Sequence, residues 1–230
     1  MKLSIIIPVF NEISTIKELV NRVKSVKMPF SKEIIIVDDG STDGSRELIK
    51  RLGCKFILKD FNEGKGSAVI EGFKKCTGDL ILIQDADLEY DPNEYPSLVK
   101  PIIDGECKVV YGSRFSSKRG NLKRNKLVYF IHLLGNSFLT FLTNLLFRAN
   151  LTDMETCYKV FLREVIEGVD FYSKGFEFEP ELTAKILKRG FKIKEVPINY
   201  FSRDFSEGKK ITFIDGLKAF YYLFKFRFSD

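Results

Sequence analysis

The sequence predicts an α/β fold in which helices cover both faces of a mostly parallel β-sheet. Short apolar runs, the pattern of strands buried on both faces, alternate with segments of helical periodicity over residues 1–112. Strands that alternate with helices favour a parallel sheet with helices on its two faces. Acidic and glycine-rich clusters follow several of the apolar runs, and ligands of parallel sheets bind at those strand ends.

The predicted strands are apolar runs, several of which end at polar or glycine residues. They lie at residues 3–9, 33–37, 55–58, 80–83 and 108–111. The first helix is predicted from apolar residues that recur at helical spacing, namely Ile13, Ile16, Leu19, Val20 and Val23. Three further helices are expected between later strands, at residues 45–52, 67–75 and 94–103.

The second part of the chain has a different pattern. Residues 127–147 form a long apolar stretch, but polar residues such as Asn136 and Thr140 lie along one stripe of it. A membrane span requires about 20 mostly apolar residues, so we predict an amphipathic helix or a pair of helices there. Residues 181–188 are predicted to be helical and residues 192–200 strand-like. Residues 211–228 are rich in aromatic side chains, with lysine and arginine among them.

Composition limits the possible partners. The formal net charge of +6 favours anionic partners, although it equally suits a protein whose charge only keeps it in solution. No nucleic-acid recognition motif is present, so no nucleic-acid partner is expected. The four cysteines lie too far apart in sequence for a zinc site or redox pair: Cys54, Cys76, Cys107 and Cys157. The N-terminal apolar run is too short for a signal peptide, so we expect reduced thiols and a cytoplasmic protein.

The strongest motif is a set of three carboxylates directly after the run at residues 80–83. Asp85, Asp87 and Glu89 stand at alternate positions where that strand is expected to end. Carboxylate oxygens are hard ligands that suit Mg²⁺ or Mn²⁺. A diphosphate leaving group needs such a cation, because it carries concentrated negative charge. In an isolated loop the same residues would be solvated surface, but their place after a buried strand favours a metal site.

Polar residues also follow three other predicted strands. Asp38 and Asp39 can bond a base N–H or a ribose hydroxyl, or can form a turn and helix cap. Residues 62–67 lack the spacing of the NTPase phosphate loop, and no dinucleotide fingerprint follows the first strand. We expect the glycine backbone there to approach a nucleotide, with Lys65 as a cation, or else to begin a helix. Arg114 can form a bidentate contact with phosphate oxygens.

In chain order these motifs resemble the family-2 glycosyltransferases of the GT-A fold, most closely the dolichol-phosphate mannose synthase and polyprenyl-phosphate branch. The motifs that carry the resemblance are at residues 7–12, 37–43, 62–66, 85–89 and 112–115, followed by 153–159, 176–181 and 195–200 with Arg203. The resemblance implies a Rossmann-like GT-A domain over residues 1–230. Its parts would be a nucleotide-binding half (1–112), an acceptor half (113–210) and a C-terminal amphipathic helix (211–230).

The resemblance also implies a reaction. It is the inverting, metal-dependent transfer of a hexose, mannose from GDP-mannose, onto a polyprenyl or dolichyl phosphate. UDP-glucose as the donor, or a glycan hydroxyl as the acceptor, is the alternative. Glu89 stands where relatives often have Gln, and residues 156–159 differ from the Gly-Phe-Arg element of relatives. These two departures leave the sugar and the nucleotide base open.

Residue roles follow from the same resemblance. The residues expected to bind the nucleotide sugar are Pro8, Val9, Asn11, Glu12, Asp39, Lys65, Asp85, Ala86 and Asp87. Asp87 and Glu89 are expected to hold Mg²⁺ or Mn²⁺. The predicted catalytic residues are Asp87, Arg114 and Arg203, and the two arginines are expected to meet phosphates.

The acceptor determines whether a base is required. A lipid phosphate is already an anionic nucleophile, whereas a glycan hydroxyl would need a base, for which Asp153 or Glu155 is available. Residues 127–147 and 211–228 are expected to contact lipid headgroups, to cover the sheet or to form a dimer face. We therefore expect peripheral association with the cytoplasmic face of the membrane. The sequence does not specify the oligomeric state.

Overall fold

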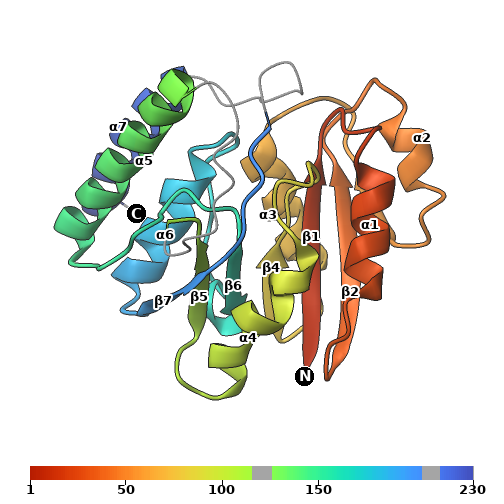
Figure 1. Cartoon of the computed structure of the whole chain (residues 1–230), viewed down its shortest axis with the longest axis horizontal. Coiled ribbons are helices and arrows are strands. Elements are labelled where there is room, and N and C mark those ends of the chain that lie inside the picture. The colour runs from red at the N-terminus through yellow and green to blue at the C-terminus, as the bar shows by residue number, and fades with distance from the viewer. Residues whose placement is uncertain (116–125, 204–212, 230) are drawn as a thin grey trace.

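The computed structural model describes residues 1–115, 126–203 and 213–229, and its centre is a seven-stranded sheet (Figure 1). The strands are β1 (Lys2–Val9), β2 (Ser31–Asp38), β3 (Lys55–Leu58), β4 (Leu80–Ile83), β5 (Val109–Ser113), β6 (Lys159–Leu162) and β7 (Ile193–Pro197). Their order across the sheet is β3-β2-β1-β4-β6-β5-β7. The predicted α/β fold with a mostly parallel sheet is confirmed, and strands from both predicted halves of the chain contribute to it.

Strand β6 was not predicted, and it is the antiparallel member of the sheet. It pairs antiparallel with both β4 and β5, whereas β1, β2, β3 and β4 pair in parallel, as do β5 and β7. The strand has only four residues and begins with the charged Lys159, which is fully buried in an ion pair with Glu179. Because β6 runs against its neighbours, the segment that precedes it reaches the edge where β4 and β5 end.

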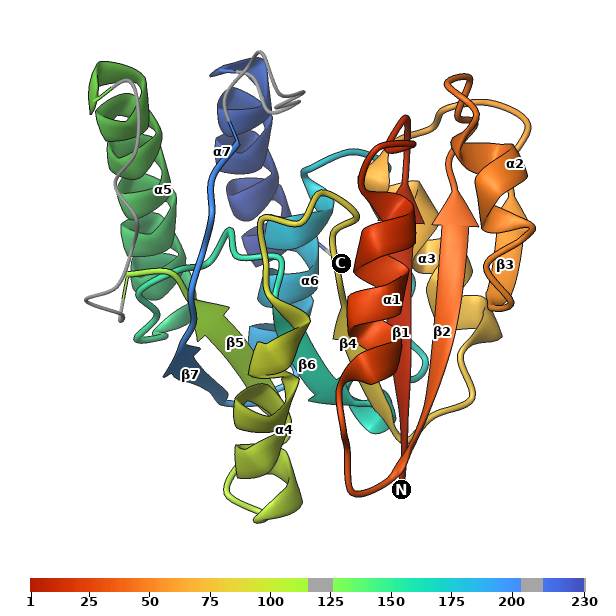
Figure 2. The same ribbon diagram turned by 45° about the vertical axis from the view of Figure 1, so that its right-hand side comes forward.

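Helices cover both faces of the sheet, with α1 (Ile16–Ser25) and α4 (Tyr95–Ile103) on one face and α3 (Lys65–Lys75) and α6 (Phe178–Lys188) on the other (Figure 2). The short α2 (Ser45–Ile49) follows β2, and two 3-10 turns lie at Pro92–Glu94 and Arg163–Val165. Apolar residues at the predicted helical spacing in α1, Ile16, Leu19, Val20 and Val23, are buried, but Ile13 is exposed and precedes the helix.

A helical layer stands beyond the β5 and β7 end of the sheet. The stretch predicted as one helix or two is the single helix α5 (Lys126–Phe147), and it packs beside α7 (Phe213–Phe228), which also contacts α6 (Figures 1 and 2). A small core of its own joins them, formed by residues such as Leu139, Leu142, Met154 and Leu223. Across the described part of the chain, no helix combines the length and apolar character that crossing a membrane would require.

Candidate active site

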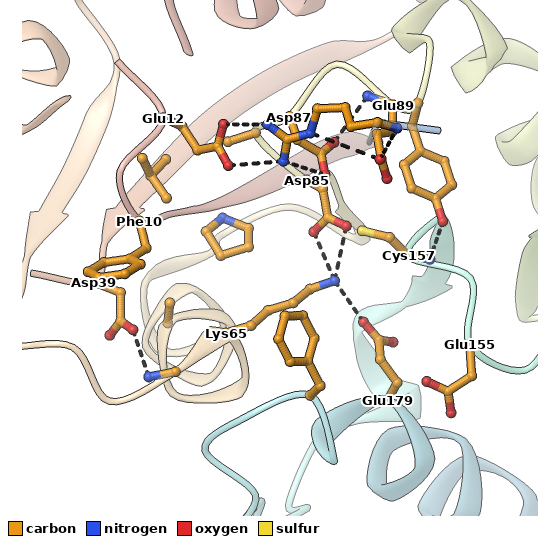
Figure 3. Close-up of a pocket in the computed structure, with 18 of the residues that line it drawn as sticks. Phe10, Glu12, Asp39, Lys65, Asp85, Asp87, Glu89, Glu155, Cys157 and Glu179 are labelled. Atoms are coloured by element: carbon orange, nitrogen blue, oxygen red, sulfur yellow. Dashed lines mark hydrogen bonds and ion pairs between the residues drawn. The ribbon is translucent and has the colours of Figure 1, made fainter. Parts of the chain in front are cut away.

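A pocket of about 340 Å³ lies where the parallel strands end (Figure 3). Its walls come from the ends of β1, β2, β4 and β5, the start of α3, the segment before β6, the region of α6 and the residues after β7. The structure brings eleven of the twelve sequence-predicted site residues to this pocket: Pro8, Val9, Glu12, Asp39, Lys65, Asp85, Ala86, Asp87, Glu89, Arg114 and Arg203. The rule that ligands meet the carboxyl ends of parallel strands therefore located the pocket.

Asn11 is the predicted site residue that does not line the pocket. Its backbone has a positive φ of 52°, and its side-chain oxygen accepts a hydrogen bond of 2.8 Å from the backbone N–H of Thr42. Its own N–H donates to the hydroxyl of Ser41 at 2.9 Å. Asn11 therefore joins the loop after β1 to the loop after β2, and this places it behind the pocket wall.

The two aspartates after β2 have different surroundings. Asp38 is fully buried and pairs with Arg46, whose Nε lies 3.0 Å from Oδ2. Asp39 lines the pocket and accepts hydrogen bonds from Lys59 at 2.5 Å and from the backbone N–H of Gly64 at 2.7 Å. Asp39 thus fixes the glycine-containing loop before α3 and also forms part of the pocket wall. Asp38 instead stabilises the loop after β2, where it accepts a hydrogen bond of 3.3 Å from the backbone N–H of Ser41.

The carboxylates after β4 surround the guanidinium of Arg203. Its two terminal nitrogens bind the carboxylate of Glu12 at 3.1 and 3.2 Å, and one lies 3.3 Å from Asp87. Glu89 accepts hydrogen bonds of 2.6 Å from the hydroxyl of Tyr200 and from the backbone N–H of Arg203. Burial and the charges of Asp85 and Glu89 raise the pKa of Asp87 to about 8, which Arg203 opposes. The cluster thus favours added positive charge.

These carboxylates fit a divalent cation. Among the side chains that the structure describes, no three from His, Cys, Asp or Glu are already gathered as a ligand group. However, burial and the neighbouring charges of Asp85 and Glu89 raise the pKa of Asp87, and a cation would relieve the repulsion between these carboxylates. Carboxylate oxygen is also the donor that Mg²⁺ and Mn²⁺ prefer. Glu89 already accepts two hydrogen bonds, but each carboxylate oxygen has a second lone pair. Asp87 and Glu89 are therefore the residues that would hold the metal.

Lys65 lies at the floor of the pocket between two carboxylates. Its ammonium is 2.8 Å from Asp85 and 3.0 Å from Glu179 (Figure 3). Glu179 in turn pairs with the buried Lys159 of β6. Charges therefore alternate in sign from the pocket into the protein interior. This chain of ion pairs holds Lys65 against Asp85.

Arg114 is held by Asp153 in a bidentate ion pair. Its Nε and Nη2 each lie 2.7 Å from an Asp153 oxygen, and its guanidinium stacks 5.1 Å over the ring of Tyr200. Asp153 is fully buried and also accepts a hydrogen bond of 3.3 Å from Asn136 of α5. The pair connects the pocket wall to the helical layer.

The Arg114 pair predicts a large effect on stability. Arg114→Ala should lower the free energy of unfolding by about 3 kcal/mol or more, because it leaves the buried Asp153 carboxylate without its ion partner. Urea unfolding followed by circular dichroism measures the change. Lys108→Ala is the matched control, since its pair with Glu164 is half exposed and should contribute less than about 1 kcal/mol. Equal losses in the two variants would show that burial does not strengthen the Arg114 pair.

The pocket also contains ten residues outside the twelve predicted site residues, of which Glu155 was considered only as a base for a glycan acceptor. They are Phe10, Asn62, Gly64, Ala68, Tyr90, Glu155, Cys157, Phe176, Glu179 and Tyr200. Several belong to the motifs at residues 7–12, 62–66, 153–159 and 176–181, so their neighbours in sequence were the available signal.

Burial raises the pKa of Glu155 to about 7, aided by the charges of Glu179 and Asp153 and opposed by Lys159 and Arg114.

Solved structures share this architecture. Glucosyl-3-phosphoglycerate synthase from Mycobacterium tuberculosis, in complex with Mn²⁺, UDP and phosphoglyceric acid, superposes with a TM-score of 0.76 at 19% identity and covers 100% of this chain and 79% of its own. The same enzyme with Mg²⁺ and UDP gives a TM-score of 0.74 at 18% identity, over 100% of this chain and 80% of its own. The fold is that of the GT-A glycosyltransferases, as predicted.

Sequence comparison gives the family. Residues 4–169 match the model of glycosyl transferase family 2, and the chain belongs to this family. A dolichol-phosphate mannosyltransferase from Pyrococcus furiosus is 30% identical over 97% of this chain and 62% of its own length. The low-salt glycan biosynthesis hexosyltransferase Agl6 from Haloferax volcanii is 31% identical over 93% of this chain and 51% of its own. The chain thus spans between half and two thirds of these two relatives.

Proposed function

We propose that the chain transfers a hexose, mannose from GDP-mannose, to a polyprenyl or dolichyl phosphate in a metal-dependent, inverting reaction. The observation that carries this proposal is a pocket in which the carboxylate cluster after β4 lies together with Arg114 and Arg203, beside a helical layer with an apolar outer face. The name of the Pyrococcus furiosus relative supports the lipid-phosphate acceptor. The UDP complexes of the solved neighbours support a nucleotide-sugar donor.

The pocket suggests how the donor would lie. Figure 3 places Phe10 and Asp39 at one end of the pocket and Glu155 at the other, with Asp85 and Lys65 between them. The nucleoside would lie at the Phe10 end, where an aromatic ring and a carboxylate suit a base and ribose. The diphosphate would then lie near the middle of the pocket, and the sugar toward Glu155. Asp87 and Glu89 would hold a divalent cation after β4, and such a cation would neutralise charge on the departing diphosphate.

The reaction would rely on positioning and charge. An oxygen of the acceptor phosphate attacks the anomeric carbon, and the bond from that carbon to the diphosphate breaks. The phosphate is already an anion, so the step requires no base. Arg203 and Arg114 would orient phosphate groups by exchanging part of their present carboxylate contacts for phosphate oxygens. Asp153, one of the two residues predicted as a base for a hydroxyl acceptor, is already engaged by Arg114.

The outer face of the helical layer suits a membrane surface. On α5 the exposed apolar residues recur at helical spacing, namely Leu134, Phe138, Phe141 and Leu145. On α7 the corresponding residues are Leu217, Phe220, Tyr221 and Phe224, and Lys218, Lys225 and Arg227 are exposed on the same helix. The two helices lie side by side, and Phe138 stacks on Phe220 with ring centres 6.1 Å apart (Figure 2). Apolar stripes with basic neighbours are typical of helices that lie at a lipid interface.

A panel of labelled donors tests the proposed reaction. The protein is incubated with radiolabelled GDP-mannose or UDP-glucose, with Mg²⁺ or Mn²⁺, and with or without polyprenyl phosphate. We expect label to enter the organic phase from GDP-mannose only when the lipid phosphate is present. Transfer of label from UDP-glucose instead would show that the proposed donor is wrong. Transfer of label only to a soluble glycan would show that the acceptor is a hydroxyl group and not a lipid phosphate.

The membrane contact predicts binding to anionic vesicles. Replacing Phe220 and Phe224 together by Ser should weaken vesicle binding by about tenfold or more, because each ring loses apolar burial in the interface. High salt should release part of the protein, since each basic residue near the surface contributes about 1 kcal/mol. Co-sedimentation with vesicles containing phosphatidylserine measures both effects.

The matched control for this experiment is a second pair of exposed phenylalanines. Phe56 and Phe61 lie on and after the edge strand β3, away from the helical layer, and their replacement by Ser should leave vesicle binding unchanged. Equal weakening by both double variants would indicate nonspecific adsorption. If the wild-type protein does not bind the vesicles, the proposed membrane contact is wrong.

A further inference from the structure

Glu155 is a pocket residue that lacks a partner. Among the described residues it has no hydrogen bond or ion pair, and its Oε1 is buried without a donor although the residue lines the pocket. Leaving a buried carboxylate oxygen unpaired costs free energy. Residues of this kind persist where a ligand supplies the missing donor.

The cations near Glu155 are already engaged with other carboxylates. Arg114 binds the carboxylate of Asp153 through Nε and Nη2, and Lys159 is paired with Glu179. Glu179 also forms an ion pair with the ammonium of Lys65. Each of these three positive charges therefore has its own carboxylate partner, and among the described residues none donates a hydrogen bond to Glu155. Glu155 is left to accept one from a bound ligand.

The position of Glu155 indicates what that donor would be. It lies at the end of the pocket opposite Phe10 and Asp39, beyond Lys65 and Asp85 (Figure 3). A nucleotide sugar that extends from the Phe10 end would place its sugar there. A phosphate would be repelled by the Glu155 carboxylate, whereas a sugar hydroxyl donates to it in a charge-assisted hydrogen bond.

We propose that Glu155 accepts a hydrogen bond from a hydroxyl group of a carbohydrate bound at this end of the pocket. The inference rests on the proposed glycosyl transfer and adds to it a residue that selects the sugar. The hydroxyl belongs to the transferred sugar of the donor or, in the alternative reaction with a glycan acceptor, to a sugar of that acceptor. Both sources share the same chemistry, and binding measurements separate them.

Calorimetry on Glu155→Ala and Glu155→Gln tests the proposal. The ligands are GDP, GDP-mannose, UDP and UDP-glucose, each with Mg²⁺. If the donor sugar supplies the hydroxyl, Glu155→Ala should lower the affinity for the nucleotide sugar by about 10- to 100-fold. The affinity for the matching nucleoside diphosphate should change by less than about twofold. Glu155→Gln should lower the affinity for the nucleotide sugar by about fivefold, because its amide oxygen still accepts a hydrogen bond but carries no charge.

If the acceptor supplies the hydroxyl, donor affinity should be unchanged and the KM of a glycan acceptor should rise about tenfold or more. Glu47→Gln, on the exposed side of α2, is the control carboxylate. Both Glu155 variants should keep or raise the melting temperature, since they remove an unpaired buried charge. A lowered melting temperature with unchanged binding would instead assign Glu155 a structural role.

The outcomes separate this inference from the function on which it rests. If wild-type protein binds a nucleotide sugar and neither variant changes donor affinity or acceptor KM, the Glu155 inference is wrong and the glycosyl-transfer proposal stands. If wild-type protein binds none of the four ligands and transfers no label, both are wrong.

Discussion

Replacing Asp87 with alanine is expected to reduce the rate of sugar transfer by about a thousandfold or more. Asp87 is the proposed metal ligand, and burial together with the charges of Asp85 and Glu89 raises its pKa, so a cation would stabilise its carboxylate form. Loss of this ligand would remove several kcal/mol of stabilisation from the departing diphosphate, and about 4 kcal/mol corresponds to a thousandfold in rate.

Transfer of label from the nucleotide sugar, measured across a range of Mg²⁺ and Mn²⁺ concentrations, checks this expectation. Glu89→Gln should be milder, because an amide oxygen can still coordinate the metal and accept from Tyr200. Full activity of Asp87→Ala at ordinary metal concentrations would remove Asp87 from the metal site.

Arg203→Ala is expected to reduce kcat/KM by about 100- to 1000-fold, the loss that follows removal of one preorganised donor to developing charge. In the structure Arg203 connects Glu12 on one side to Asp87 and Glu89 on the other. Its removal would leave three carboxylates facing each other without a cation from the protein. Arg203→Lys keeps the charge but loses the bidentate geometry, so its kcat/KM should still fall by about tenfold.

Steady-state kinetics with the preferred donor separate the two Arg203 variants. Arg22→Ala is the control, because its pair with Glu18 on the surface of α1 is half exposed. If Arg203→Lys and Arg22→Ala both keep wild-type kcat/KM, Arg203 does not contact the phosphates.

The sequence predicted those parts of the fold that depend on local pattern. Apolar runs located the first five strands to within a few residues, because all of these except the edge strand β3 are largely buried, which leaves little choice of residue there. The pattern failed at β6, whose first residue is a buried lysine. That burial depends on Glu179, which lies 20 residues further along the chain, and a local pattern does not contain such a partner.

The candidate site shows the same division. Position after a strand was enough to bring Asp85, Asp87 and Arg114 to one pocket. The partner of each charge was not predictable, because it is set by distant segments. Asp153 and Glu155 are two residues apart and equal candidates in the sequence, yet Arg114, 39 residues before Asp153, engages one and leaves the other without a partner.

The antiparallel β6 has a consequence for how the protein folds. The wall that carries Phe10 and Asp39 belongs to β1 and β2, whose contacts with each other are close in sequence, as in the bond between Ser4 and Glu33, 29 residues apart. The opposite wall depends on β4 meeting β6, as in the bond between Gln84 and Tyr158, 74 residues apart. Contacts between distant residues form later on average. A partly folded chain would therefore form the wall proposed to hold the nucleoside before the wall proposed to hold the sugar.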